Sequence, residues 1–161
     1  VPCILLGADG VGPHLKYYGL PAGYEFVTLL EGVAALSRGI SPLHPRSRRA
    51  LRRLDRDAHI QVFVTLTCPY CPQAARLAFA MAMETPRVRA DVVDAEEFPH
   101  LAQAYRVQAV PKVVINNLQE FVGALPEPLF LQKVLSSLGR EDLLQEEKGG
   151  PGPQGPISPE A

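Results

Sequence analysis

The cysteine pair at positions 68 and 71 restricts how this chain can fold more than any other feature. The segment Cys68-Pro69-Tyr70-Cys71 follows a β-branched run at 60–64 and precedes apolar residues at helical spacing over 72–84. The pair therefore lies where a predicted strand meets a predicted helix. Backbone N–H groups and the helix dipole favour a thiolate at such a junction and lower the pKa of Cys68. Disulfide exchange also needs a resolving thiol, so we expect Cys68 to attack and Cys71 to resolve, with Cys71 the less exposed.

Two structural alternatives for the pair stay open. Cysteines three positions apart lie on one face of a helix, so both could be core residues or half of a zinc or iron–sulfur site. No second Cys/His pair has ligand spacing, because His59 and His100 are isolated. We therefore expect no metal and no cofactor at this site.

The elements around the pair alternate between strand and helix. A second strand is predicted over 88–93, followed by a short helix that Leu101, Tyr105 and Val107 mark and that ends before Val110-Pro111. Two strands over 110–115 and about 121 and a helix up to 138 complete the series. The order is β-α-β-α-β-β-α over residues 58–140. Such alternation, closed by an antiparallel hairpin, predicts a mixed sheet covered on both faces, which is the α/β arrangement of a thioredoxin fold.

Three prolines bear on the site. Pro69 is expected in the first helical turn, where its missing N–H costs little, and Pro72 is early enough to be tolerated. The pair Val110-Pro111 begins a strand 40 positions after Cys71. In a thioredoxin fold a proline here is cis and packs beside the cysteines, where exposed backbone can pair with an incoming peptide. A trans proline at a strand edge is the alternative.

A faint internal repeat relates the N-terminal segment to the end of this unit. Residues 1–6, 17–21 and an amphipathic run to 36 follow the same order as residues 110–115, 121–126 and the run to 138. Both copies have the pattern strand, turn, strand, helix. We therefore interpret residues 1–40 as the C-terminal half of a second thioredoxin-like domain, docked on the complete one.

The remaining segments are a linker and a tail. Residues 41–57 include six arginines and two aspartates after position 44, with Ala50, Leu51 and Leu54 among them. This predicts an amphipathic helix with a solvated basic face; a nucleic-acid patch is the alternative, although no aromatic or glycine-rich element accompanies the charge. Residues 141–161 end in a Gly/Pro-rich stretch that we expect to be disordered.

Composition excludes several classes of protein. The formal net charge is −1 at pH 7, and no run approaches the ~18 apolar residues of a membrane span, so neither a membrane nor a nucleic acid is an expected partner. Three cysteines are too few for a secreted disulfide scaffold. We expect redox chemistry in a reducing compartment, the cytoplasm.

Three segments of the chain resemble the glutaredoxin-like protein disulfide oxidoreductases of thermophilic archaea and bacteria. They are residues 18–26 (YGLPAGYEF), 63–72 (FVTLTCPYCP) and 107–112 (VQAVPK), and the similarity covers residues 1–140. Those proteins carry two tandem thioredoxin folds. The resemblance implies that the sequence lacks an N-terminal part, that Val1-Pro2 is the cis-proline point of the first fold, and that a Cys68–Cys71 disulfide acts on protein disulfides.

A second relative is the N-terminal arm of the flavoprotein that reduces alkyl hydroperoxide peroxiredoxins. It shares the stretch Gly-x-Pro-x-Gly-x-Glu-Phe, which is residues 19–26 here. Because no dinucleotide-binding domain follows, we expect the free-standing enzyme. The implied partners are protein disulfides or dithiols, and a thioredoxin-reductase-like flavoprotein or a peroxiredoxin.

The chain departs from the thioredoxin pattern in its proton acceptor. Thioredoxins place a buried carboxylate six positions before the first cysteine, where this chain has Val62. The related arm presents a glutamate from its first half-domain toward the second site, which implies Glu25 as the acceptor here. The alternative is a first-turn glutamate that only complements its helix dipole.

Two further departures concern thiol chemistry. The Gly-Gly and Cys-x-Asp elements that hold glutathione in glutaredoxins are absent after Gly123, so glutathione is not an expected partner. We expect Cys3 to be a small buried strand residue rather than a surface thiol.

The leading hypothesis is an enzyme that exchanges disulfides with protein substrates through its Cys-Pro-Tyr-Cys dithiol. The alternatives are a redox-inert module that binds clients in the same groove, or an electron-transfer arm that feeds a peroxiredoxin. A half-domain with uncovered strand edges would instead fold poorly or associate. The direction of electron flow depends on the redox potential of the pair relative to its compartment.

Overall fold

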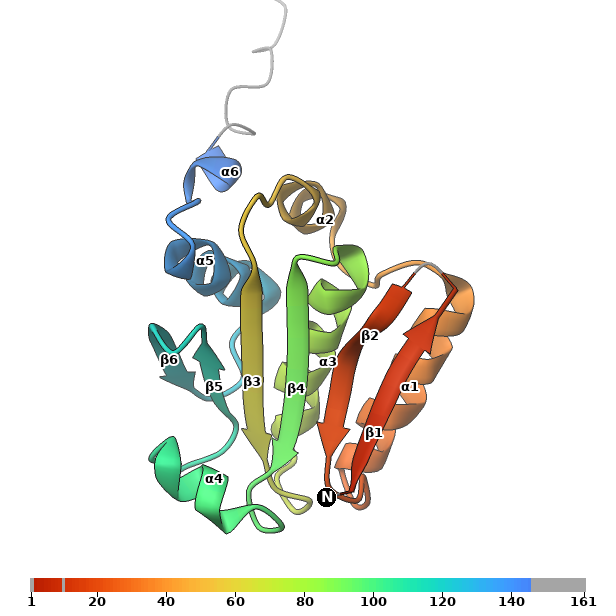
Figure 1. Ribbon diagram of the computed structural model, residues 1–161, viewed down its shortest axis with the longest axis vertical. Helices are drawn as coiled ribbons and strands as arrows, with labels where there is room; N and C mark the ends of the chain where they lie inside the picture. Colours follow the sequence, from red (N-terminus) through yellow and green to blue (C-terminus); the bar gives the residue numbers. More distant parts are fainter. Residues whose placement is uncertain (1, 10, 146–161) are drawn as a thin grey trace, which may run out of the picture.

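The computed structural model describes residues 2–9 and 11–145 (Figure 1). The strands are β1 (Cys3–Ala8), β2 (Val11–Tyr18), β3 (Ala58–Val64), β4 (Val88–Asp94), β5 (Lys112–Ile115) and β6 (Gln119–Val122). The helices are α1 (Glu25–Arg38), α2 (Pro45–Arg52), α3 (Cys71–Glu84), α4 (Pro99–Ala104), α5 (Glu127–Ser137) and α6 (Asp142–Gln145). The disordered tail was expected from residue 141, but Asp142–Gln145 form α6 and Leu143 is buried in the core, because its apolar side chain packs there. The rest of the predicted tail, 146–161, and the Val1-Pro2 bond lie outside the described residues.

All six strands form one mixed sheet in the order β1-β2-β4-β3-β5-β6. Strands β2, β4 and β3 are parallel, and their carboxyl ends meet at one end of the sheet, because Tyr18 pairs with Val93 and Val64 with Asp94. The predicted β-α-β-α-β-β-α unit is confirmed as β3-α3-β4-α4-β5-β6-α5. The β1-β2-α1 segment extends the same sheet through the β2–β4 pairing.

The two faces of the sheet are covered by different helices. On β3, Ile60 and Val62 are buried in the large core cluster that also holds the apolar residues of α3 and α5. Phe63, between Val62 and Val64, points to the other face, where it belongs to a small cluster with Phe98, beside α4. Helices α1 and α3 pack against each other on the first face (Figure 1). Within the described ranges, no helix is long and apolar enough to cross a membrane.

The arginine-rich segment is joined to the rest of the molecule by charge pairs. Helix α2 lies against α3, where Arg48 and Arg52 both pair with Glu84, whose side chain is almost fully buried. Arg56 donates to the carbonyl of Leu138 at 2.8 Å. Arg48, Arg52 and Arg56 therefore bind groups within the molecule, which does not favour the alternative that this segment forms a nucleic-acid-binding surface.

The expectation that Cys3 is buried is wrong. Cys3 is exposed, because it begins β1, the outermost strand of the sheet, and its strand is covered on one side only. In β1 only Leu6 is buried.

The N-terminal segment touches the cysteine loop through its backbone. The N–H of Tyr24 donates to the carbonyl of Leu66 at 3.0 Å, two residues before Cys68. Gly23 makes this approach possible, because its φ is +55° and a Cβ at this position would lie 2.5 Å from the Leu66 oxygen. The segment that leads into α1 therefore supports the loop that carries the cysteines.

We predict that Gly23→Ala lowers the free energy of unfolding more than Gly39→Ala does. Gly39 is a matched control, because its φ is +67° but nothing lies within 4 Å of the position that a Cβ would take there. Both variants lose about 1–2 kcal/mol from the positive φ, and Gly23→Ala loses about 1–3 kcal/mol more from the clash. Urea denaturation measures both losses, and equal losses would show that the Leu66 contact is not tight.

Candidate functional site

The cysteine pair closes a turn at the start of α3. Cys68 and Cys71 form a disulfide with their Cα atoms 5.5 Å apart. The N–H of Cys71 donates to the Sγ of Cys68 at 3.1 Å. Pro69 was expected within the first helical turn, but the helix begins at Cys71, and Pro69 lies in the turn before it. The sulfur of Cys68 accepts the first free N–H of the helix, so the turn from 68 to 71 ends where the helix begins.

The two sulfur-bearing residues differ in exposure. Cys71 is fully buried, whereas Cys68 keeps 9% of its surface and is flanked by Tyr70, which is 69% exposed, and by exposed Pro69. A partner approaching from solvent therefore meets Cys68 first. This is the order that disulfide exchange requires of an attacking and a resolving thiol.

Val110-Pro111 lies at the same end of the sheet as the disulfide. Strand β5 runs antiparallel to β3, and Lys112 pairs with Phe63 near the carboxyl end of β3. The Val110–Pro111 peptide bond is cis, Pro111 is buried, and Val110 packs against the core cluster that contains both cysteines. The structure thus brings the predicted proline and the predicted cysteines to one edge.

Glu25 is the first residue of α1 and is completely buried. Burial raises its pKa to about 7; nearby Asp94 adds to this shift, whereas the Thr28 hydroxyl and the Arg76 guanidinium of α3 oppose it. Within the described part of the chain, neither carboxylate oxygen has a hydrogen-bond partner. Val62, the position of the usual acid, is fully buried and apolar.

Sequence reasoning missed the polar groups around Glu25. The hydroxyls of Tyr17 and Thr28 are also fully buried without a partner among the described residues. Burial raises the pKa of Tyr17, and the charges of Glu25 and Asp94 raise it further. The sequence held one signal for these polar groups. Side chains alternate between the two faces along β2, so Tyr17 lies on the same face as buried Leu15, and Asp94 ends the apolar run of β4, which is parallel to β2.

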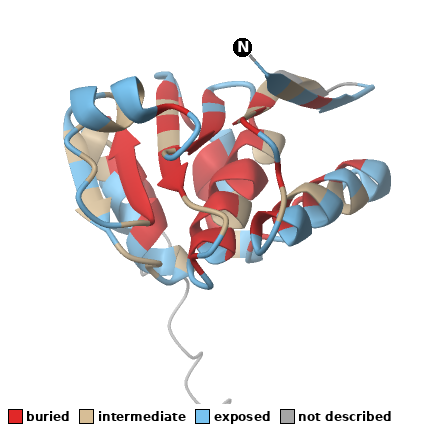
Figure 2. Ribbon diagram, turned by 90° about the horizontal axis from the view of Figure 1, so that it is seen from below, coloured by how far each residue is buried: buried red, intermediate tan, exposed pale blue. Residues whose placement is uncertain are grey.

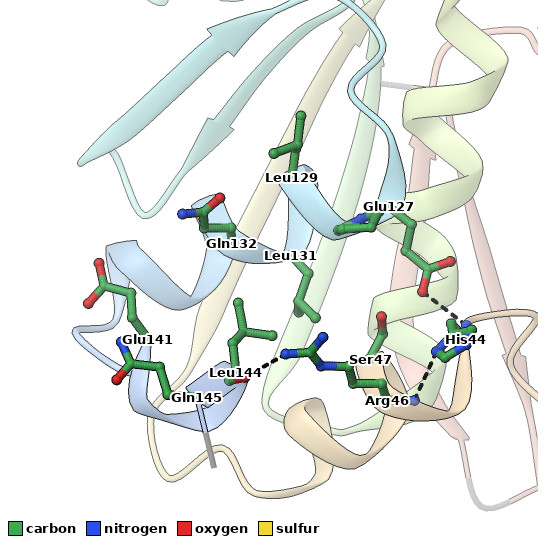
Figure 3. Close-up of a pocket in the computed structure, with 11 residues that line it drawn as sticks. His44, Arg46, Ser47, Glu127, Leu129, Leu131, Gln132, Glu141, Leu144 and Gln145 are labelled. Carbon is green, nitrogen blue, oxygen red and sulfur yellow. Dashed lines mark hydrogen bonds between the residues drawn. The ribbon is translucent and has the colours of Figure 1, made fainter. Parts of the chain in front are cut away.

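A cavity lies elsewhere, at the opposite end of the sheet from the disulfide (Figure 3). Its volume is about 720 Å³, and it lies between α2, α5 and α6. His44 donates its N–H to Glu127, and Arg46 donates to the carbonyl of Leu144. No cysteine lines it, so we do not assign it to the disulfide chemistry.

Comparisons with known proteins agree with this geometry. A family model described as a thioredoxin domain matches residues 58–136. A protein disulfide oxidoreductase from Aeropyrum pernix K1, known from its crystal structure, is 34% identical with a TM-score of 0.79, over 87% of this chain and 61% of that one. The alkyl hydroperoxide reductase component AhpF of Enterococcus faecalis is 28% identical with a TM-score of 0.75, over 83% and 64%.

The corresponding alkyl hydroperoxide reductase component of Staphylococcus aureus is 26% identical over 139 residues, which make up 86% of this chain and 26% of the relative. The chain therefore spans about a quarter of the length of this curated relative and less than two thirds of the two solved chains. The similarity extends beyond residues 58–136 into the N-terminal segment that carries Glu25.

We predict that Glu25→Gln stabilises the oxidised protein above pH 7 but not at pH 4. The pKa of Glu25 is raised from 4.5 to about 7 on folding, so its contribution to stability is full below pH 4.5 and is lost as the pH rises through 7. Gln cannot ionise and avoids this loss. The expected gain at pH 8 is about 3 kcal/mol at most, measured by urea denaturation.

Glu96→Gln serves as the control, because Glu96 is exposed and its backbone, not its side chain, bonds Asp94. It should change stability by a similar, small amount at both pH values. A Glu25→Gln gain that does not depend on pH would contradict the raised pKa.

Proposed function

Because residues 58–136 belong to the thioredoxin domain family and the chain is homologous to a protein disulfide oxidoreductase, we propose that it exchanges disulfides with protein substrates through Cys68 and Cys71. The observation that supports this most is the asymmetry of the pair. Cys68 keeps some exposed surface in the turn before α3, whereas Cys71, the first residue of α3, is fully buried.

The reaction transfers two electrons from the dithiol to a substrate disulfide. The Cys68 thiolate attacks one substrate sulfur and releases the other as a thiolate, which takes up a proton. Cys71 then loses its proton, attacks the Sγ of Cys68 and releases the second substrate thiol, which leaves the Cys68–Cys71 disulfide. The N–H of Cys71, 3.1 Å from Sγ in the disulfide, is placed to stabilise a Cys68 thiolate. The reverse sequence oxidises a substrate dithiol.

The substrate polypeptide is proposed to dock on the exposed rim around Cys68. Pro69 and Tyr70 form one side of this rim, and the Val110-Pro111 segment at the start of β5 forms the other. Support comes from the exposure of Tyr70 and from the shared edge to which the sheet brings β5 and α3. Tyr70 supplies an aromatic surface and Val110 an apolar one.

Glu25 is proposed to accept the proton of Cys71 in the resolving step. It starts a helix that packs on α3, the helix that Cys71 begins, and Arg76 of α3 acts on its pKa. A carboxylate whose pKa is near 7 exchanges protons readily at neutral pH. This role fits the burial of Glu25 better than helix-dipole compensation, because a surface carboxylate would compensate the dipole without the cost of desolvation.

A second candidate function is electron transfer to a peroxiredoxin. The observation that favours it is the match to the alkyl hydroperoxide reductase component of Staphylococcus aureus over 86% of this chain. In this case a flavoprotein reductase supplies electrons to Cys68–Cys71, and a peroxiredoxin disulfide receives them. Either function places the protein in a reducing compartment such as the cytoplasm.

We predict that the chain catalyses reduction of insulin disulfides by dithiothreitol and that Cys68→Ser abolishes turnover. Cys71→Ser should instead accumulate a mixed disulfide at Cys68, visible by mass spectrometry under non-reducing conditions. Cys3→Ser is the matched control and should keep the native rate, since Cys3 lies on the outermost strand. A native chain without turnover would support the redox-inert module, and activity that survives Cys68→Ser would refute the assignment of the nucleophile.

We also predict that Glu25→Gln lowers the rate of mixed-disulfide resolution by about 10²-fold at pH 8, the lower end of general acid–base effects. In the native protein this rate should rise with pH through about 7, as Glu25 loses its proton. The variant should lack that rise. Stopped-flow release of substrate thiol over pH 5.5–9 measures both rates, and an unchanged pH profile would assign Glu25 a structural role only.

A further inference from the structure

Asp94 is a second buried carboxylate at the end of the sheet that carries the disulfide, and the proposed thiol chemistry does not use it. It is the last residue of β4 and is only 1% exposed. Its partner in the β3–β4 register is Val64, four positions before Cys68. Figure 2 looks onto this end of the sheet, where buried residues fill the centre of the molecule. Because a buried charge is costly, a second carboxylate at this place needs a physical reason.

Asp94 and Glu25 reach the same side of the sheet from different elements. Side chains alternate along β4, so Asp94 lies on the face of Val92, which belongs to the core cluster that includes α3. Glu25 begins α1, which packs on α3 on this same face. The charge of Asp94 contributes to the raised pKa of Glu25. The two carboxylates are therefore close enough to interact within the core.

Tyr17 interacts with both carboxylates. It pairs with Val92 in the β2–β4 register and is fully buried on the same face of the sheet. The charges of Glu25 and Asp94 both raise its pKa. Its hydroxyl and the two carboxylate oxygens of Glu25 are buried without a hydrogen-bond partner among the described residues. Buried polar atoms that no protein group satisfies are the usual binding sites of internal water.

Arg76 and Glu97 are the charged groups that border this set. Arg76 of α3 lowers the pKa of Glu25 and so favours its charged form. Glu97 is exposed and lies beside Asp94, because a Cβ at Gly19 would be 2.9 Å from the Cβ of Asp94 and 3.4 Å from the carboxyl carbon of Glu97. Strand β1, which packs under α1, carries no charged residue. The buried groups thus approach solvent on the side of Glu97.

We propose that Glu25 and Asp94 form a linked pair of carboxylates, joined through the Tyr17 hydroxyl and an internal water molecule. This pair carries the proton of Cys71 from the buried site to solvent. The Cys71 thiol loses its proton to the Glu25 carboxylate. The proton of Glu25 moves to the bridging water, a proton of that water moves to the Tyr17 oxygen, and the hydroxyl proton of Tyr17 moves to Asp94. Asp94 releases it to solvent beside Glu97, and the water, the tyrosine and both carboxylates end with the protons with which they began.

Tyr17 and Asp94 act through Glu25 and are positioning residues for the proton. The step that starts at Cys71 rests on the proposed function, whereas the link between the two carboxylates does not. It can therefore be measured in the oxidised protein, where no disulfide exchange takes place.

The alternative role of Asp94 is structural. Its Oδ1 accepts the N–H of Glu96 at 2.9 Å, in the turn that follows β4. Asn keeps an oxygen that can accept this bond but carries no charge, so Asp94→Asn separates the two roles. Asp91→Asn is the matched control. Asp91 is buried on the same strand, but its side chain contacts His59 on the opposite face of the sheet.

NMR of isotope-labelled carboxyl groups measures the titration of Glu25 in the oxidised full chain, and Glu25→Gln identifies its signal. The native midpoint should lie at about pH 7. Asp94→Asn should lower it by about one pH unit, because a like charge is removed, and Asp91→Asn should leave it unchanged. Tyr17→Phe should raise it, because the charged form of Glu25 loses a hydrogen-bond donor.

A midpoint that Asp94→Asn leaves in place overturns the proposal, as does one that Tyr17→Phe fails to raise; if one variant does not fold, the other decides. The rise of the resolution rate with pH should move in Asp94→Asn by the same amount as the carboxyl titration. A rate profile that keeps its native position overturns the role in proton transfer. Absence of disulfide exchange in the native chain would instead refute the proposed activity, while the titration still decides whether the carboxylates are linked.

Discussion

The backbone hydrogen bond between Tyr24 and Leu66 is the contact on which the arrangement of the site depends. It joins the N-terminal segment to the loop that carries Cys68, and the close approach at Gly23 leaves no room for a side chain. Because Glu25 follows directly and begins α1, the same contact fixes where a buried carboxylate enters the core. Together with the β2–β4 pairing, it makes residues 2–38 part of the structure around the disulfide rather than a separate appendage.

The buried polar groups around Glu25 reduce stability. A buried carboxylate and two buried hydroxyls without partners each cost desolvation free energy, and apolar replacements of similar shape would remove that cost. Proteins accept such costs where a proton has to be held away from bulk water. The raised pKa of Glu25 follows from the same burial, so the instability and the capacity to exchange a proton near neutral pH have one physical origin.

The sequence predicted the elements from β3 to α5 well, because their apolar periodicity is clear and the cysteines and Pro111 mark fixed points of the fold. It could not predict which side of α1 is buried. Although the run to residue 36 is amphipathic, Thr28 and Gly32 of its less apolar side are buried, whereas Phe26, Leu30 and Val33 are exposed. The rule that charged residues face solvent likewise points the wrong way for Glu25. The prediction that Cys3 is buried was wrong for a related reason. The burial of a strand residue depends on the place of its strand in the sheet, and pairing between segments far apart in the sequence decides which strand lies at the edge. The start of α3 was misplaced because the sulfur of Cys68 takes a hydrogen bond that sequence patterns do not reveal.

The two sides of helix α1 differ in chemistry and in burial. Its inner side carries Glu25 and Thr28 against α3, and its outer side carries Phe26 and Leu30. Neighbouring residues of one helix turn thus serve different purposes, and a rigid helix cannot move one side without the other. Helix α1 is therefore oriented by its inner residues, which place a carboxylate and a hydroxyl on the side that packs on α3.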